Sequence, residues 1–310
     1  MTEVQKAKAT GVDTAVLDEA TVETFRTNLR GSLLLPSDAG YEEVRQVWNG
    51  LIDRRPALIV RCAGPADVIA AVNFARTLNL LVSVRGGGHN VAGNSVCDGG
   101  LMIDLSLMKG IRVDPEARTA WAQGGVTWGD LDCETQVFGL AAPGGVVSTT
   151  GIAGLTLGGG LGWLRRQYGL SCDNLLAIDI VTADGQLRTA SETENSDLFW
   201  GIRGGGGNFG VVTSFQYRLY PVGPTVMMCV VMYPMAEARE ILHAWRDFMQ
   251  TAPDTISSQA YFWNVPDVDA FPIASRNQPV IIIAALYSGT AEEAPRFAEQ
   301  GDREFGIERL

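Results

Sequence analysis

The sequence predicts an α+β fold, with a glycine-rich α/β part followed by a smaller α+β part. Residues 57–85 show a strand, helix, strand pattern, and short alternating strands dominate the chain from 101 to 219. Two prolines and a glycine at 220–224 then precede a second strand, helix, strand pattern. The 310 residues are 46% hydrophobic and 19% charged, a globular composition long enough for two domains.

The first 50 residues are predicted to form a helical leading segment. Apolar residues recur there at helical spacing, and residues 41–48 predict a second short helix that ends at Asn49-Gly50. The residues with helical spacing are Val22, Phe25 and Leu29.

A strand at 57–61, a helix opened by Gly64-Pro65 and a strand at 80–85 predict a βαβ unit. The helix is assigned from one apolar face, formed by Val68, Ile69, Val72, Ala75 and Leu78. The second strand therefore delivers the chain into the run Gly86-Gly87-Gly88-His89.

The remaining elements are short strands with helices between them. We expect strands at 101–105, 110–114, 119–123, 175–183, 186–190 and 211–219, and helices at 127–138 and 196–203. Asp184-Gly185 predicts a hairpin turn, and Ser196 is available as a helix cap. In the second part we expect strands at 226–233 and 280–287, an amphipathic helix at 237–250 and an unfinished helix at 291–310.

The charge and hydropathy of the chain exclude several classes of partner. The net charge of −11 and the absence of a basic run disfavour nucleic acid. The longest aliphatic stretch, 280–287, is too short to cross a membrane, and the N-terminus lacks a secretory signal, so we expect a soluble, cytoplasmic protein. The oligomeric state is not indicated.

The five cysteines predict no disulfide framework or zinc site. They are widely spaced, odd in number and lack a C-x-x-C pair, so buried thiols are the default expectation and no metal site is predicted.

Residues 205–210 match G-x-G-x-x-G by letter, but a helix precedes them and a strand follows. The dinucleotide fingerprint needs the reverse order, so a Rossmann site is disfavoured. A tight turn between helix and strand is the structural interpretation of these glycines, and it stays open beside a functional one. The P-loop motif is absent, and so are H-E-x-x-H and G-x-S-x-G.

Two glycine-rich runs are candidates for cofactor contact, since 27 of the 36 glycines fall between Gly86 and Gly210. Successive backbone N–H groups at 86–90 favour an anion such as a diphosphate. His89 is one of two histidines, and taken alone it is more often a turn residue than a ligand. His243 lies on the polar side of its helix and is expected to be solvated. The run at 144–162 fits either a flat ligand or packing alone.

Three blocks in this order resemble the FAD-linked oxidases of the berberine bridge enzyme type. They are Arg85-Gly-Gly-Gly-His-Asn90, the run from Pro143-Gly-Gly-Val-Val-Ser-Thr-Thr-Gly to Tyr168-Gly-Leu, and Asp197-Leu-Phe-Trp-Gly-Ile-Arg-Gly-Gly-Gly-Gly-Asn-Phe-Gly210. The resemblance covers residues 45–222 closely and implies the vanillyl-alcohol-oxidase, or PCMH-type, FAD-binding fold of two lobes. With the helical segment expected at 1–50 from its apolar spacing, the resemblance implies the FAD-binding domain at 51–222 and a partial substrate domain at 223–310.

The resemblance implies FAD as cofactor and gives roles to individual residues. His89 matches the histidine that bonds covalently to the flavin 8α-methyl group, and the loop 86–90 matches the pyrophosphate-binding loop. The implied cofactor contacts are Arg85, Gly86, Gly87, Gly88, His89, Asn90, Gly144, Gly145, Val147, Thr149, Thr150, Gly151, Gly154, Ile180 and Val181.

The sequence departs from the family pattern at several points. Val147 stands where many members have a second flavin-linking cysteine, so we expect a single covalent bond. Thr150 replaces a branched apolar residue where the family controls oxygen access, which leaves dioxygen open as the acceptor. The family's C-terminal Tyr-x-Asn segment is absent, and a fragment, a truncated product and a minimal variant all stay open.

The implied activity is FAD-dependent oxidation of an alcohol or amine carbon in a sugar, an alkaloid-like molecule or a polyketide. The catalytic base is unassigned, and Tyr168, Arg203 and Tyr261 are weak candidates for substrate contact. Two alternatives stay open: an FAD-binding protein without turnover, and a noncovalent FAD and NADPH reductase of the same superfold.

Overall fold

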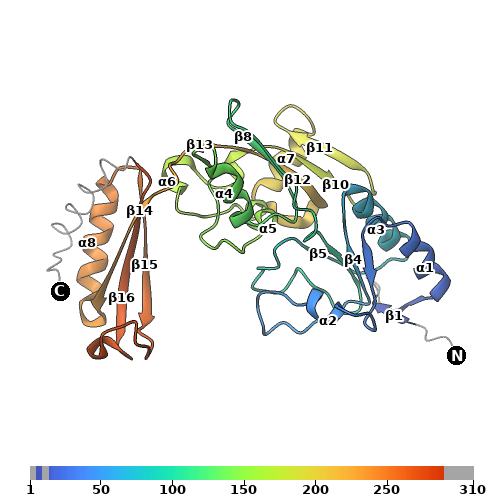
Figure 1. Cartoon of the computed structure of the whole chain (residues 1–310), viewed down its shortest axis with the longest axis horizontal. Coiled ribbons are helices and arrows are strands. Elements are labelled where there is room, and N and C mark those ends of the chain that lie inside the picture. The colour runs from blue at the N-terminus through green and yellow to red at the C-terminus, as the bar shows by residue number, and fades with distance from the viewer. Residues whose placement is uncertain (1–4, 9–13, 290–310) are drawn as a thin grey trace. The chain divides into compact units, whose positions relative to one another are not determined.

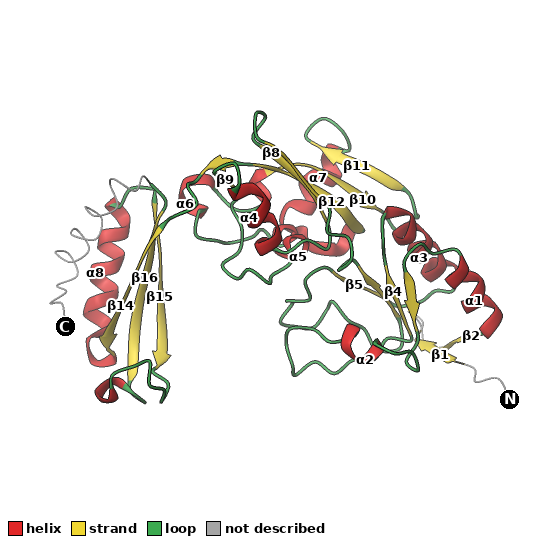
Figure 2. Cartoon of the chain, viewed as in Figure 1, coloured by secondary structure: helices red, strands yellow, loops and turns green. Residues whose placement is uncertain are grey.

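The computed structural model describes residues 5–8 and 14–289 and divides the chain into two compact units. The first comprises residues 1–162 and 170–220, and the second comprises residues 163–169 and 221–310. Figure 1 shows the chain from blue to red, and Figure 2 shows its helices and strands. The α+β fold class is confirmed, because both units combine helices with sheets.

The first unit begins with a four-stranded sheet in the order β3-β4-β6-β5. Strands β4 (Leu58–Arg61) and β5 (Val82–Arg85) each pair in parallel with the central β6 (Leu101–Asp104), and β3 (Ser32–Leu34) pairs antiparallel with β4. Parallel pairing requires a crossover, and α3 (Pro65–Thr77) supplies it. The predicted βαβ unit is thereby confirmed.

Both faces of this sheet are covered, which explains why its strands read as continuous apolar runs. Helix α3 and α1 (Glu19–Thr27) pack on one face, in a core that includes Val22, Val68 and Leu101. The short helix α2 (Tyr41–Val44) covers the other face. This packing fixes the direction in which β5 delivers the following glycines.

An antiparallel five-stranded sheet, in the order β11-β10-β12-β8-β7, forms the second lobe of this unit. Its strands are β7 (Ile111–Asp114), β8 (Thr119–Gln123), β10 (Leu175–Val181), β11 (Leu187–Ser191) and β12 (Val211–Arg218). The predicted hairpin between β10 and β11 is confirmed, and Gly185 in its turn has φ +77°.

Three helices pack in the core of this second lobe. They are α4 (Trp128–Gln136), α5 (Ile152–Leu157) and α7 (Ser196–Gly205), and the core they share includes Trp128, Ile152 and Phe199. Trp128, Phe199, Phe215 and Tyr217 are the largest side chains buried there.

The second unit contains an antiparallel sheet in the order β14-β16-β15. Its strands are β14 (Met227–Pro234), β15 (Ile256–Asn264) and β16 (Pro279–Tyr287). The amphipathic helix α8 (Ala238–Thr251) packs against one face of this sheet, where Phe248 and Met249 contact a small buried cluster. The short α6 (Arg165–Tyr168) also belongs to this unit, and Arg166 donates from Nη2 to the Ala252 carbonyl at 2.9 Å.

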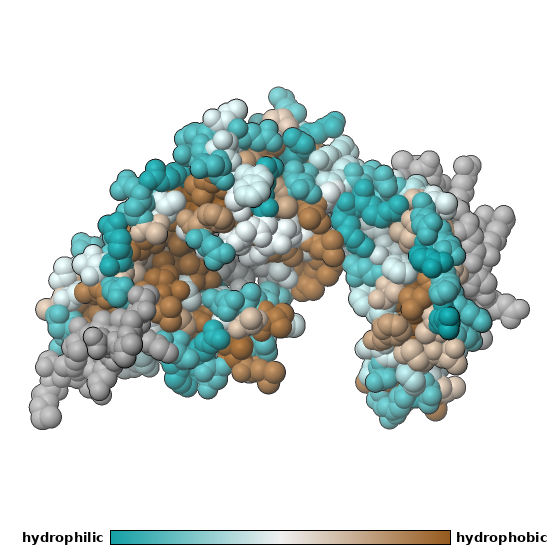
Figure 3. Space-filling model, turned by 180° about the vertical axis from the view of Figure 1, so that it is seen from behind, coloured by the Kyte–Doolittle hydropathy of each residue, from teal (hydrophilic) through white to brown (hydrophobic). Residues whose placement is uncertain are grey.

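The remaining described elements are short. They are β1 (Gln5–Lys8), β2 (Thr14–Leu17), β9 (Leu140–Ala141), β13 (Tyr220–Pro221) and the 3₁₀ turns Cys172–Asn174, Gly206–Phe209, Met235–Glu237 and Ile273–Ser275. None of the helices within the described residues has the length and apolar character needed to cross a bilayer. Figure 3 shows apolar areas, in brown, among the polar surface of the first unit.

Several predicted elements differ from the structure. The leading segment contains strands as well as helices, because β3 pairs with residues 59–61, which lie far along the chain. Helix α2 ends at Val44 rather than at 48. Ser196 does not cap α7, whose N-cap residue is Asn195 in a left-handed conformation with φ +46°. The expected helix at 291–310 lies outside the described residues.

Candidate functional site

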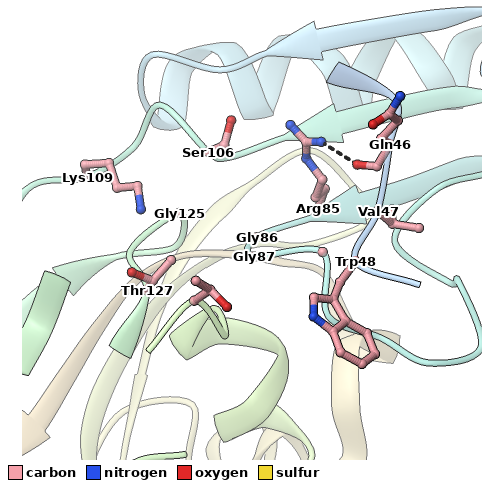
Figure 4. Close-up of a pocket in the computed structure, with 12 residues that line it drawn as sticks. Gln46, Val47, Trp48, Arg85, Gly86, Gly87, Ser106, Lys109, Gly125 and Thr127 are labelled. Atoms are coloured by element: carbon pink, nitrogen blue, oxygen red, sulfur yellow. Dashed lines mark hydrogen bonds between the residues drawn. The ribbon is translucent and has the colours of Figure 1, made fainter. Parts of the chain in front are cut away.

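A pocket of about 220 Å³ opens where β5 ends, and the glycine run from Gly86 to Gly88 lines it. Figure 4 shows Ser106, Lys109 and Thr127 at one end of this pocket and Trp48 at the other. The pocket is smaller than the roughly 300–1,000 Å³ typical of small-molecule sites. It therefore has room for part of a dinucleotide rather than the whole.

The backbone of the glycine loop is suited to an anion. Within the described residues, the backbone N–H groups from Gly86 to Val91 have no hydrogen-bond acceptor. Gly88 adopts φ +71°, a conformation that glycine reaches without strain. Gly88 is buried and Gly86 and Gly87 are partly buried, and successive N–H groups without a protein acceptor can form a concave anion site, so the loop fits the diphosphate of FAD.

A second loop, residues 147–152, lies directly against the first. A Cβ atom on Gly87 would stand 2.3 Å from the Gly151 nitrogen, and a Cβ atom on Gly151 would stand 2.3 Å from the Gly87 nitrogen. Only glycine permits this approach. The contact brings residues 89 and 149 opposite each other, because each lies two positions from a contacting glycine.

The second loop is fixed to the beginning of α4 by backbone hydrogen bonds. Trp128 donates its N–H to the Thr150 carbonyl at 2.9 Å, and Gly129 donates to the Ser148 carbonyl at 2.9 Å. Ile152 donates to the Val126 carbonyl at 3.0 Å. These bonds hold the threonines at 149 and 150 against the glycine loop.

His89 is half-buried, and each of its ring nitrogens contacts a threonine hydroxyl. Nε2 lies 3.0 Å from Thr149 Oγ1, and Nδ1 lies 3.3 Å from Thr150 Oγ1. The indole of Trp48 stacks on the imidazole, with ring centroids 5.3 Å apart and an interplanar angle of 21°. Burial lowers the pKa of His89 below its ordinary value of 6.5, which favours the neutral, nucleophilic ring.

Arg85 supports the site from behind the loop. Its Nε and Nη2 donate to the two carboxylate oxygens of Asp104 at 3.0 Å each, and Nη1 donates to the carbonyls of Val44 and Gln46. Asp104 is fully buried and also accepts from Ser106 N and Oγ, at 3.0 and 2.9 Å. The guanidinium of Arg85 therefore ties the ends of β5 and β6 to the segment that follows α2.

The far end of the pocket carries an ion pair that the sequence analysis missed. Lys109 Nζ donates to Asp130 Oδ2, which also accepts from the N–H of Thr127 at 2.8 Å and from its hydroxyl at 2.7 Å. Burial opposes ionisation of Asp130, but these hydrogen bonds outweigh it and lower its pKa. Thr127-x-x-Asp130 forms a capping box at the helix start that the sequence predicted at 127, and this pattern could have identified Asp130.

Trp48 is another pocket residue that the sequence analysis did not assign to the site. The backbone N–H of Trp48 donates to the Gly88 carbonyl at 3.1 Å, which attaches the segment before Asn49 to the glycine loop. Its side chain is 64% exposed. An exposed tryptophan immediately before an Asn-Gly turn was the available signal.

The structure groups some of the predicted cofactor contacts and separates others. Arg85, Gly86, Gly87, Gly88 and Thr149 line the pocket. His89, Thr150 and Gly151 lie beside it through the contacts given above. Asn90 is exposed, and its Oδ1 accepts from the Asn94 N–H at 3.0 Å.

The remaining predicted contacts do not line the pocket. Gly144 and Gly145 pack against the Trp128 ring, while Val147 is 46% exposed. Gly154 is exposed on α5, with open space where a Cβ would point. Ile180 and Val181 are fully buried in β10, between β11 and β12, and belong to the protein core.

The other residues that the sequence analysis named do not line the pocket. The guanidinium of Arg203 lies 4.7 Å from the Phe199 ring centroid, and Tyr168 and Tyr261 belong to the second unit. His243 is exposed, as predicted. Cys133 is exposed, contrary to the expectation of buried thiols, because it lies on the outer side of α4.

The run at 205–210 follows helix α7 and precedes β12, as predicted, and it makes close backbone contacts. A Cβ on Gly210 would stand 2.4 Å from the Val181 carbonyl oxygen, and its φ is +148°. This glycine is required for packing against β10.

Comparison with known proteins decides the family. Residues 56–191 match the model of an FAD binding domain. Residues 56–191 therefore form an FAD-binding domain of the kind found in FAD-linked, PCMH-type oxidoreductases. The resemblance seen in the sequence motifs is thereby confirmed. FAD is the cofactor of this chain.

Two curated members of the family show the extent of the similarity. An FAD-linked oxidoreductase of Dictyostelium discoideum is 35% identical over 90% of this chain and 59% of its own length. The (R)-6-hydroxynicotine oxidase of Paenarthrobacter nicotinovorans is 42% identical over 62% of this chain and 42% of its own length.

The solved structure of 6-hydroxy-D-nicotine oxidase from Arthrobacter nicotinovorans superposes with a TM-score of 0.81. Its identity to this chain is 34%, over 91% of this chain and 60% of that one. The chain thus spans about two fifths to three fifths of the length of these relatives.

Proposed function

We propose that this chain is part or all of an FAD-dependent oxidoreductase in which the flavin is bonded covalently to His89. The observation that carries the proposal is the position of His89, at the end of an anion-binding glycine loop and with both ring nitrogens directed at the neighbouring threonine loop. A histidine that served only in a turn would not need this set of partners.

The residues of the site divide the work of holding the cofactor. The unpaired N–H groups of the loop from Gly86 bind the diphosphate, and Gly87 and Gly151 let the two loops meet without side chains between them. The lowered pKa of His89 keeps its ring uncharged at neutral pH, as attachment through a ring nitrogen requires. Val147 offers no thiol, so one covalent bond is expected.

When bound, FAD supplies hydride acceptance at its flavin ring. The substrate class we propose is a small molecule with an oxidisable alcohol or amine carbon, such as a sugar, an alkaloid-like compound or a polyketide. The names of the nicotine oxidase relatives favour a carbon next to nitrogen. Dioxygen is the proposed final acceptor.

Two alternative functions can be separated from this proposal by experiment. The first is an FAD-binding unit without turnover. A noncovalent, NADPH-dependent reductase of the same superfold is the other. Bleaching of the bound flavin by NADPH, together with loss of flavin on acid precipitation, would favour it.

The test is to purify the chain with FAD and to compare total flavin with flavin that survives acid precipitation. We expect wild type and His243→Ala to keep acid-stable flavin and His89→Ala to lose all of it while still binding FAD noncovalently. Acid-stable flavin in His89→Ala contradicts the assignment. A screen of amines, sugars and alcohols for anaerobic bleaching then separates the oxidoreductase from a cofactor-binding unit.

A further inference from the structure

We propose that Thr149 is a positioning residue that holds the imidazole of His89 as the Nε2–H tautomer, so that Nδ1 presents its lone pair to the flavin carbon. This inference rests on the proposed function, because it concerns how His89 is prepared for attachment. It assigns to Thr149 a role that differs from cofactor contact.

The two threonine contacts differ in length, and since each hydroxyl can donate or accept, we infer the tautomer from the shorter contact. The 3.0 Å contact from His89 Nε2 to Thr149 Oγ1 has the usual length of an N–H to oxygen hydrogen bond. The 3.3 Å contact from Nδ1 to Thr150 Oγ1 is longer than that range and so is weaker. Nδ1 is therefore the nitrogen that can exchange its partner for a new bond at lower cost.

Neighbouring contacts fix both residues of the shorter contact, His89 and Thr149. Gly87 and Gly151 touch backbone to backbone, which sets residues 89 and 149 opposite each other. The Thr149 loop is bonded to the start of α4 at its neighbours, Ser148 and Thr150. The imidazole itself is covered by the indole of Trp48, so rotation of the ring would break the stack as well as the hydrogen bond.

The chemistry of attachment makes a fixed tautomer useful. In the proposed step Nδ1 of His89 forms a bond to the 8α-methyl carbon, and one C–H bond of that carbon breaks. Positive charge then develops on the imidazole and strengthens the hydrogen bond that Nε2–H donates to Thr149, until the Nε2 proton leaves. The methyl proton and the Nε2 proton, with the two electrons lost by the carbon, reach dioxygen through the flavin ring and form hydrogen peroxide.

A first experiment examines the chain without cofactor. The protein is prepared from riboflavin-limited cells, and the ring nitrogen resonances of its two histidines are recorded by long-range ¹H–¹⁵N NMR. We expect His89 of wild type and Thr149→Ser to be mainly the Nε2–H tautomer and His89 of Thr149→Val to be a mixture. The exposed His243 serves as an internal reference for an imidazole in water.

A second experiment measures the rate at which acid-stable flavin forms when FAD and air are added to the same three proteins. Loss of one hydrogen bond to a charge-developing group predicts a decrease of about tenfold in Thr149→Val. Thr149→Ser keeps the hydroxyl and is expected to stay within about twofold of wild type. Total bound FAD is measured in the same samples, so that each attachment rate is expressed per bound FAD.

The outcomes separate this inference from the proposed function. Unchanged tautomer and unchanged attachment rate in Thr149→Val would overturn the role of Thr149 while leaving His89 as the attachment site. An Nε2–H tautomer that depends on Thr149, in a chain that forms no acid-stable flavin, would support the positioning and refute the covalent function. An Nδ1–H tautomer in wild type would also overturn the inference.

Discussion

Asp104 illustrates how a single residue outside the cofactor contacts supports the site. Its buried carboxylate accepts hydrogen bonds from Arg85 and Ser106, and it pairs with Arg61 at 3.3 Å. Arg85 in turn holds the segment that leads to Trp48. One carboxylate therefore couples the end of β5 to the loops on both sides of the pocket.

Removing this carboxylate is expected to destabilise the protein strongly. Asp104→Ala leaves two arginines with an unpaired charge, one of them only 12% exposed, so the free energy of unfolding should fall by about 3–5 kcal/mol. Urea denaturation measures the free energy of unfolding. Asp247→Ala removes an exposed ion pair with Arg246 and should change this free energy by less than about 1 kcal/mol. Equal, small effects in both variants would contradict a structural role for Asp104.

The lowered pKa of His89 predicts the pH dependence of flavin attachment. Burial favours the neutral ring, so the attachment rate should fall to half of its maximum at a pH below the ordinary histidine value of 6.5. Between its folded and unfolded pKa values His89 binds fewer protons when folded, so it also makes the protein less stable as the pH falls through this range. Initial rates of acid-stable flavin formation from pH 5 to 8 test this. A half-maximal rate above pH 6.5 is the contrary result.

At the scale of elements, the site depends on the contact between two glycine loops. Gly87→Ala places a methyl group 2.3 Å from the Gly151 nitrogen, so the loops must separate and His89 must move away from Thr149. We expect acid-stable flavin to fall at least tenfold, since a displacement of about 1 Å at a reacting group costs on the order of 100-fold in rate.

Gly207→Ala is the matched control for this substitution. Its Cβ meets open space and its φ is negative, so flavin attachment and stability should stay near wild type. Comparable losses in the two variants would show that the loop contact is not the reason for the glycine at 87.

Elements whose pattern and end signals all lie within one short stretch of sequence were predictable. The helix α3 has an apolar face and a proline at its start, and the hairpin of β10 and β11 has Asp184-Gly185 in its turn. The strand β15 was missed, because Ser257, Ser258 and Gln259 give it no apolar alternation, and its pairing with β16 is tertiary. Helix α5 was missed because glycines surround it and its burial comes from α4 and β12.

The residues of the site divide in the same way, into those with a local sequence signal and those that only tertiary contacts bring together. The glycine loop and His89 could be predicted, because successive glycines and a family motif occur within one short segment. The contact of His89 with Trp48 and with Thr149 joins segments 41 and 60 residues apart, so only the fold brings them together. The Lys109 and Asp130 pair likewise depends on the return of the chain from β7 to α4.

At the scale of the whole molecule, FAD uptake should stabilise the unit that holds the pocket. A ligand that binds only the folded state at 100 times its dissociation constant adds about 2.7 kcal/mol, which raises Tm by about 5–10 °C for a unit of this size. Differential scanning fluorimetry of cofactor-free protein with and without FAD measures the shift. AMP in place of FAD is the control for nonspecific nucleotide binding, and equal shifts with the two would contradict recognition of the dinucleotide.

The central claim is that FAD lies on the main chain of the glycine loop and is bonded to His89, and the spectrum of the acid-precipitated, washed protein tests it most directly. We predict that the pellet of wild-type chain, dissolved in denaturant, shows the absorbance of an oxidised flavin at about one equivalent per chain. A colourless pellet from protein that has been incubated with FAD would contradict the account.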